Sequence, residues 1–251
     1  PRVLQNVEVR VGASIGIAFR SKEDNSTTRL LMNADIATYN AKREGRGRSS
    51  FYAKGAREAL AERLQTADDF RRAIANGEIA AFFQPQVDMI SGHLSGLEAL
   101  VRWHHPSKGI LSPAAFLDVV LDAGLSGQLA MAVVDDALRA LSVWRDMGFD
   151  VPKIGVNLAA EQLRDHEFTK KLEETVWNAG VASEHIAIEV LESVLVENAR
   201  DPVVENIREL SNMGFPIELD DFGTGYSSIS NLVSFKVNRI KIDRKFIAGI
   251  D

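Results

Sequence analysis

The sequence predicts an α/β protein. Its larger part, residues 71–251, is expected to form a βα barrel of the eight-stranded type, represented by about six strands. Apolar strand-like runs alternate there with helix-like segments, which is typical of βα units with parallel pairing. These runs are nearly all apolar, as parallel strands covered on both faces should be. A smaller α/β piece at 1–54 and a helical connector at 55–70 are expected to precede this part.

The composition is that of an ordinary globular protein, with 251 residues, 45% of them hydrophobic and 25% charged. The net charge of -6 argues against a surface for nucleic-acid polymers. The absence of cysteine excludes disulfides and thiolate metal sites and fits a cytoplasmic location. No apolar run approaches the ~20 residues of a membrane-spanning helix. We expect the chain to be a piece of a longer protein, which could carry a membrane anchor N-terminal to this span.

The first block, residues 1–54, is predicted to contain a strand, then a helix, then a second strand. Val7–Phe19 (VEVRVGASIGIAF) alternates and then becomes apolar, which predicts a strand. Ser26 or Thr27 can cap a helix with one broad apolar face. Gly45 is expected to end that helix, and Ser49–Tyr52 is expected to form a short strand.

Three stretches of this block, SIGIA, ADIATYNAK at 34–42 and GRGRSSFY at 45–52, resemble the last third of a GGDEF diguanylate cyclase domain. The motif that names that domain and the family's catalytic acid are not in this chain. The resemblance implies nucleotide-phosphate contacts at Lys42 and Arg46, and their four-residue spacing predicts one shared helix face. The alternative, which we favour, is a solvated basic helix end that complements the helix dipole.

The second block follows the connector at 55–70, whose Ala, Glu, Leu and Arg content favours a helix. The predicted strands are Ile79–Val87, Leu94–Trp103, Val151–Leu158, His185–Leu191, Pro216–Leu219 and Asn238–Asp243. The predicted helices cover residues 113–123, 126–147, 160–179, 201–213 and 227–234.

One of these strands runs directly into two adjacent carboxylates. The apolar run Pro216–Leu219 is followed by Asp220, Asp221 and the glycine-containing turn Phe222–Gly225. This pattern also fits a strand that stops at a solvated turn. The other interpretation is a metal site, since neighbouring carboxylates repel each other and a bound cation removes that repulsion.

Polar side chains at the ends of the other strands favour the metal site. Carboxyl ends of barrel strands converge on one face, so these side chains are expected to meet, whereas scattered acids would more often be solvated. Carboxylate and amide oxygens are ligands for Mg²⁺ or Mn²⁺ and are not typical of zinc sites. The polar residues at the strand ends are Gln84, Glu98, Asn157, Glu189, Asp220, Asp221 and Lys241.

Five motifs in this order resemble the EAL domain, a family that hydrolyses cyclic di-GMP. They are LEALVRW at 97–103, VNL at 156–158, IEVLES at 188–193, DDFGTGYSS at 220–228 and IKIDRKFI at 240–247. The resemblance implies a two-metal phosphodiesterase site that uses Mg²⁺ or Mn²⁺ and releases linear pGpG. The metal ligands that it implies are Glu98, Asn157, Glu189, Asp220 and Asp221.

The resemblance also implies roles for residues around the metals. Lys241 would lie beside the attacking water and the phosphate, and would share the catalytic role with Glu98 and Asp221. Arg102 would contact a phosphate. Two further substrate-binding positions are implied, Gln84 and Asp243. Glu192 would brace the glycine-rich loop after the aspartate pair, and a homodimer through the EAL domain is a further expectation.

The sequence departs from the family pattern in two places. Leu191 stands where the family commonly has Thr. The chain stops at Asp251, before two further strands of the family, so we expect the 238–243 strand to be a sheet edge and the isolated span to be weakly active or inactive. A catalytically silent cyclic di-GMP receptor and a regulatory scaffold are the alternatives. The implied ligands within this span are all present, which favours the enzyme.

Glu218 carries a separate expectation. Strand side chains alternate, so Glu218 points to the same side as Asp220, into or near the barrel interior. A bare charge is costly there, and Arg239, which shares a side with Lys241, is the expected partner. The alternative is a solvated Glu218 at the open end of its strand.

Overall fold

The computed structural model describes residues 2–4, 7–9, 12–20, 26–192, 194, 202–223 and 236–248. The chain divides into two compact units, Pro1–Asp69 and Phe70–Asp251. The division falls within helix α2 (Ala56–Ala75), which is longer than the predicted connector. None of the described helices is both long enough and apolar enough to cross a bilayer.

The described part of the first unit holds two small sheets, one long helix of its own and the greater part of α2. Its elements are β1 (Arg2–Leu4) antiparallel to β2 (Val7–Val9), β3 (Ile15–Ile17) parallel to β4 (Ser49–Phe51), and α1 (Thr27–Arg43). The single strand predicted over 7–19 is wrong, because β2 and β3 belong to different sheets. The predicted helix cap is confirmed, since the Ser26 hydroxyl accepts a hydrogen bond from Arg29 N at 3.4 Å. A Cβ at Gly16 would lie 2.0 Å from Ala34 O, so glycine lets β3 pack closely on α1.

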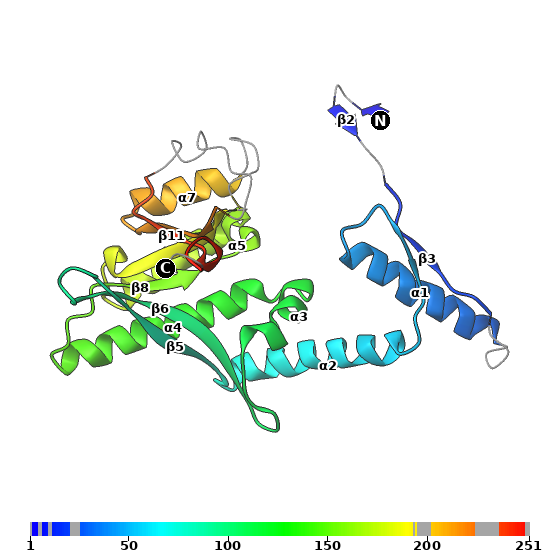
Figure 1. Cartoon of the computed structure of the whole chain (residues 1–251), viewed down its shortest axis with the longest axis horizontal. Coiled ribbons are helices and arrows are strands. Elements are labelled where there is room, and N and C mark those ends of the chain that lie inside the picture. Colours follow the sequence, from blue (N-terminus) through cyan, green and yellow to red (C-terminus); the bar gives the residue numbers. More distant parts are fainter. Residues whose placement is uncertain are drawn as a thin grey trace. The chain divides into compact units, whose positions relative to one another are not determined.

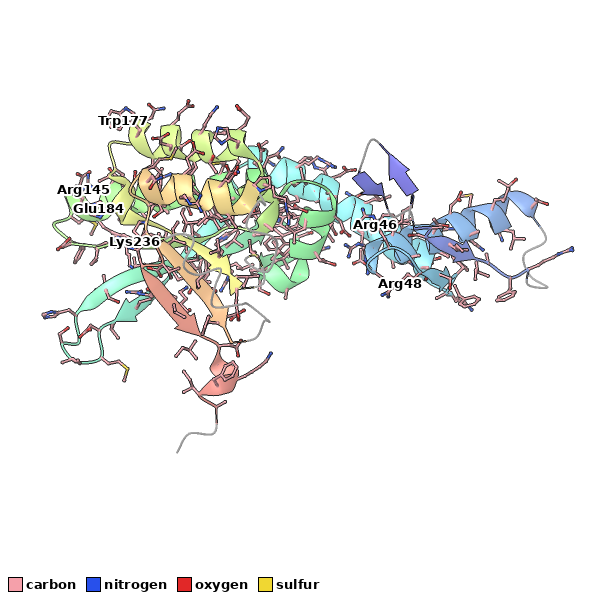
Figure 2. The ribbon with its side chains drawn as sticks, turned by 90° about the horizontal axis from the view of Figure 1, so that it is seen from above. Arg46, Arg48, Arg145, Trp177, Glu184 and Lys236 are labelled. Atoms are coloured by element: carbon pink, nitrogen blue, oxygen red, sulfur yellow. The ribbon has the colours of Figure 1, made fainter. Side chains whose placement is uncertain are left out.

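The end of α1 corrects one expectation. The helix stops at Arg43, and Gly45 and Arg46 follow with φ of +111° and +58°. Lys42 and Arg46 therefore do not share a helix face, because Arg46 lies beyond the last turn. Figure 2 shows Arg46 and Arg48 in this part of the chain, where both are exposed.

The second unit is built on a curved sheet. Its strands are β5 (Ile79–Val87), β6 (Leu94–His105), β7 (Gly109–Leu111), β8 (Ile154–Asn157), β9 (Ile186–Leu191), β10 (Ile217–Phe222) and β11 (Arg239–Ile242). They follow the order β11-β10-β9-β8-β6-β5, with β7 on β6. The predicted parallel pairing is confirmed from β6 to β11. Strand β5 is antiparallel to β6, because the connection at 88–93 is too short for a crossover.

Most helices of this unit form an outer layer on the sheet (Figure 1). They are η1 (Pro113–Ala115), α3 (Leu117–Asp122), α4 (Ser126–Asp146), α5 (Ala160–Arg164), α6 (His166–Asn178), η2 (Ser183–His185) and α7 (Pro202–Asn212). The short η4 (Arg244–Phe246) follows β11 and lies outside this layer. The helix predicted over 160–179 is two helices, because the Asp165 carboxylate accepts from Glu167 N at 3.0 Å and caps a new one. The helix predicted over 227–234 lies outside the described residues.

The two faces of the sheet differ in chemistry. The face toward the helices is apolar and includes the buried side chains of Ile154, Ile188 and Leu219. The opposite, concave face is polar, and side chains reach across it. Lys241 Nζ on β11 donates to Glu98 Oε2 on β6 at 2.9 Å. Strands β5 and β11 end the sheet and are not paired with each other in the described part of the chain, so the predicted edge at β11 is confirmed.

Candidate active site

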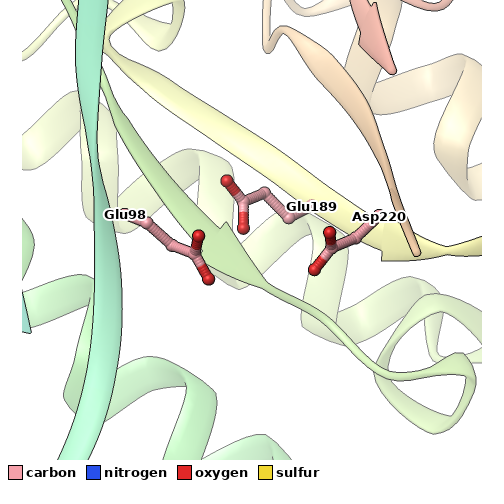
Figure 3. Close-up of side chains that lie close together, drawn as sticks. All are labelled: Glu98, Glu189 and Asp220. Carbon is pink, nitrogen blue, oxygen red and sulfur yellow. The ribbon is translucent and has the colours of Figure 1, made fainter. Parts of the chain in front are cut away.

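Three acids from three strands meet on the concave face. Glu98 on β6, Glu189 on β9 and Asp220 on β10 each offer one carboxylate oxygen, and these oxygens all lie within 4.8 Å of one another (Figure 3). Their convergence, predicted from the strand ends, is confirmed. Carboxylates this close repel each other unless a cation or a proton is shared among them.

Asn157 joins this group from β8. It pairs with Glu189 in the register of β8 and β9, and its Nδ2 donates to Glu98 Oε1 at 3.3 Å. The structure therefore places the amide at the carboxylate cluster. Its role as a metal ligand stays a prediction.

Glu189 is the most buried member of the cluster. Its side chain is 0% exposed, and Oε1 lies 2.5 Å from Lys241 Nζ in an ion pair. Apart from this ion pair, no group among the described residues donates a hydrogen bond to either Glu189 oxygen. Buried polar atoms without donors are rare in proteins. Burial raises the pKa of Glu189 to about 7, against the opposing effect of Lys241.

These observations test whether the cluster fits a divalent cation. Three carboxylates and one amide are hard oxygen donors of the kind that such ions prefer. The buried oxygens of Glu189 have Lys241 beside them but accept no other hydrogen bond among the described residues, so they could also coordinate a cation. The described residues therefore fit a metal site.

Lys241 lies between two of the acids. Its Nζ is 2.9 Å from Glu98 Oε2 and 2.5 Å from Glu189 Oε1. Burial alone would lower the pKa of Lys241, but the charges and hydrogen-bond contacts of Glu189 and Glu98 outweigh it and hold the pKa above its ordinary value. Lys241 therefore stays protonated and partly compensates the carboxylates.

Asp221 and Asp243 lie next to the cluster. The pairing of β10 with β11 shifts register between Leu219 and Phe222, and Asp221 has a φ of +52°. Such an irregularity turns side chains away from strict alternation. Burial raises the pKa of Asp221, with Asp220 and Asp243 adding to the rise. The metal role of Asp221 and the substrate role of Asp243 stay predictions.

Glu192 contacts the start of the loop that it was predicted to brace. Its Oε2 accepts a hydrogen bond from Gly223 N at 2.7 Å. The remainder of that loop, at 224–228, lies outside the described residues. Supporting the loop stays a predicted role for Glu192.

Two predicted substrate residues lie on the same concave face. Gln84 pairs with Glu98 in the register of β5 and β6, and both line a cavity of about 610 Å³ together with Lys241. The Arg102 guanidinium stands over the Phe82 ring, with its Cζ 5.5 Å from the ring centroid. The structure brings Gln84 to the cavity, whereas the residues that line the cavity do not include Arg102.

Sequence reasoning missed one partner in the interior. Glu218, 1% exposed, forms an ion pair with Lys153 Nζ, and Arg239 Nη1 lies farther away at 3.8 Å. The predicted partner Arg239 is therefore the second cation, and the alternative of a solvated Glu218 is wrong. Alternation along β8 could have found Lys153, because it places this residue on the same side as Asn157.

Comparison with known families agrees with this architecture. Residues 67–251 match the family model of the EAL domain. The chain belongs to the EAL domain family. The matched span begins after the first block, so the resemblance of residues 1–54 to a GGDEF domain stays a prediction.

Curated relatives of this EAL protein include two named for cyclic di-GMP. The bifunctional diguanylate cyclase/cyclic di-GMP phosphodiesterase MucR of Pseudomonas aeruginosa is 35% identical over 247 residues, covering 98% of this chain and 36% of MucR. The cyclic di-GMP phosphodiesterase PdeR of Escherichia coli is 33% identical over 244 residues, covering 97% of this chain and 36% of PdeR. The chain thus spans about a third of the length of these relatives.

Solved structures show the same fold. The PaMucR phosphodiesterase in its c-di-GMP complex superposes with a TM-score of 0.69 at 35% identity, covering 74% of each chain. The EAL enzyme Bd1971 in its cAMP- and cyclic-di-GMP-bound form has a TM-score of 0.67 at 23% identity, covers 89% of this chain and 58% of that chain, and supports the fold alone.

Proposed function

We propose that this EAL domain hydrolyses cyclic di-GMP to linear pGpG with the help of Mg²⁺ or Mn²⁺. The observation that carries the proposal is the meeting of Glu98, Glu189 and Asp220 within 4.8 Å, with Lys241 beside them. The names of MucR and PdeR support the choice of substrate.

The acids supply the binding part of the mechanism. Glu98, Glu189 and Asp220 would hold the ions, with Asn157 and Asp221 completing the set. When bound, such ions lower the pKa of a water and withdraw charge from the phosphodiester. The buried position of Glu189 favours ion binding, because a buried carboxylate that shares its one cation, Lys241, with Glu98 is costly.

Lys241 supplies a fixed positive charge. Neighbouring carboxylates hold its pKa above the ordinary value, so it carries a positive charge at neutral pH. This ammonium group would stabilise the charge that grows on the phosphate oxygens. In the reaction, one bond between phosphorus and a ribose 3′ oxygen breaks. The water gives its OH to the new 5′ phosphate and its remaining hydrogen to the 3′ hydroxyl.

Gln84 and Arg102 would position the substrate. The cavity of about 610 Å³ is lined by Gln84 together with Glu98 and Lys241. The guanidinium of Arg102 can bind a phosphate oxygen pair in a fixed orientation, and the Phe82 ring beneath it restricts its rotamers.

The test is a turnover assay on the full-length protein. We expect pGpG, separated by chromatography, to form with Mn²⁺ or Mg²⁺ and to stop on addition of EDTA or in Glu98→Gln. Glu184→Gln is the matched control, because Glu184 is an exposed acid in η2, which precedes β9 (Figure 2). Cyclic di-GMP binding without turnover in the parent protein would reject the enzyme and select the silent receptor.

A further inference from the structure

A glycine lies under the carboxylate cluster. Gly155 on β8 pairs with Glu98 on one side and with Ala187 on the other. A Cβ built on Gly155 would lie 2.1 Å from Glu189 Oε1 and 2.7 Å from its Cδ. No side chain other than hydrogen fits at this position while Glu189 keeps its place.

The topology explains why this space matters. Strand β8 lies between β6, which carries Glu98, and β9, which carries Glu189. Neighbouring strands are about 4.8 Å apart, so the backbones of these two acids are separated by roughly 10 Å. Their carboxylate oxygens nevertheless approach within 4.8 Å. Glu189 is opposite Asn157 in register, so its side chain leans back over Gly155 to reach Glu98.

The backbone of Gly155 gives no other reason for glycine. Its φ lies outside the left-handed range that favours glycine. The atoms that a Cβ would meet belong to the Glu189 side chain and not to a neighbouring backbone, unlike the situation at Gly16. Glycine within a strand also weakens that strand relative to larger residues. The volume taken up by Glu189 is therefore the feature that requires it.

We propose that Gly155 is a positioning residue of the metal centre, whose missing side chain is the space that lets Glu189 cross β8 and meet Glu98. The metal part of this inference rests on the proposed function, whereas the steric part does not. Any larger residue at 155 would move the Glu189 carboxylate away from Glu98 and Lys241 and would enlarge the site.

The steric part is tested by a double-mutant cycle at positions 155 and 189, in which the melting temperature of the full-length protein is measured in EDTA. Gly155→Ala should lower the melting temperature by roughly 5 °C, because it forces a buried side chain to move. In the Glu189→Ala background the same substitution should change it by less than about 1 °C, since the space is then vacant. Equal losses in both backgrounds would overturn the proposal. If Gly155→Ala does not fold, the double variant must fold, and an unfolded double variant would also overturn it.

The positioning part is tested by direct metal binding. Mn²⁺ affinity, followed by the loss of the free-ion electron paramagnetic resonance signal, should fall roughly tenfold or more in Gly155→Ala. The control is Gly127→Ala in α4, where a Cβ would meet only Phe168 at an ordinary 3.8 Å, and it should bind Mn²⁺ like the parent. Unchanged affinity in Gly155→Ala would refute the positioning role. If the parent protein binds Mn²⁺ but forms no pGpG, the proposed function is refuted while the positioning role of Gly155 is not.

Discussion

Glu189→Gln should stabilise the metal-free protein at alkaline pH while removing its metal site. Burial raises the pKa of Glu189 from an ordinary 4.5 to about 7. Between these two values the folded state holds a proton that the unfolded state has released. The favourable contribution of this group is therefore complete below pH 4.5, falls as the pH rises, and is lost by about pH 8.

The size of this effect follows from the pKa difference. A difference of about 2.5, at 1.36 kcal/mol for each unit of pKa, amounts to about 3 kcal/mol of stability lost between pH 4.5 and pH 8. Glutamine carries no charge and has nearly the same shape, so the variant avoids this loss. Lys241 loses one of its two carboxylate partners in the variant, which reduces the expected gain to about 1 to 3 kcal/mol.

Urea unfolding at pH 5 and pH 8, in EDTA and then in Mn²⁺, measures this directly. In EDTA at pH 8 the variant should have the higher midpoint, and at pH 5 the gap should shrink. In saturating Mn²⁺ the order should reverse, since only the parent is stabilised by binding. A variant less stable than the parent in EDTA at pH 8 would refute the idea that burial of the Glu189 charge costs stability.

Three further outcomes are expected. Lys241→Ala should cut turnover by roughly 100-fold while Mn²⁺ affinity stays within about tenfold of the parent, so near-normal turnover would reject its role. Lys153→Met should cost about 3 kcal/mol in urea unfolding, because it leaves the buried Glu218 with Arg239 at 3.8 Å as its remaining cation, and adding Glu218→Gln should recover part of the loss. Glu192→Ala should lower turnover at least about tenfold by freeing Gly223 N, and full activity in this variant would remove the bracing role.

The clustered acids could be predicted from the sequence more accurately than the rest of the fold, because one physical rule brings strand-end side chains together. Carboxyl ends of parallel strands lie at one edge, so an acid at the end of each of several strands has to meet the others. Glu189 and Asp220 follow that rule near the ends of β9 and β10, whereas Glu98 meets them from within the longer β6. Lys153 does not follow the rule, since it precedes its strand and finds Glu218 from a distant part of the chain.

Two predictions about helices were wrong for local reasons that the spacing of apolar residues does not reveal. The helix predicted over 160–179 breaks where Asp165 can cap a new start, although the apolar spacing continues across it. Arg46 leaves the helix because Gly45 allows a positive φ, so its spacing from Lys42 no longer means a shared face. Hydrogen bonds of single side chains and single backbone angles decided both cases.

The two buried acids, Glu218 and Glu189, differ in the number of cations around them. Glu189 and Glu218 are direct partners on β9 and β10 and point to the same interior, an arrangement that is unfavourable for two like charges. Glu218 is held by Lys153 and approached by Arg239 as well, so its charge is compensated by the fold itself. Among the residues that the structure describes, Glu189 has Lys241 as its one cationic partner, and Lys241 is shared with Glu98. The deficit of positive charge therefore lies on the side of Glu189, and it is there that a divalent cation would lower the free energy of the folded protein most.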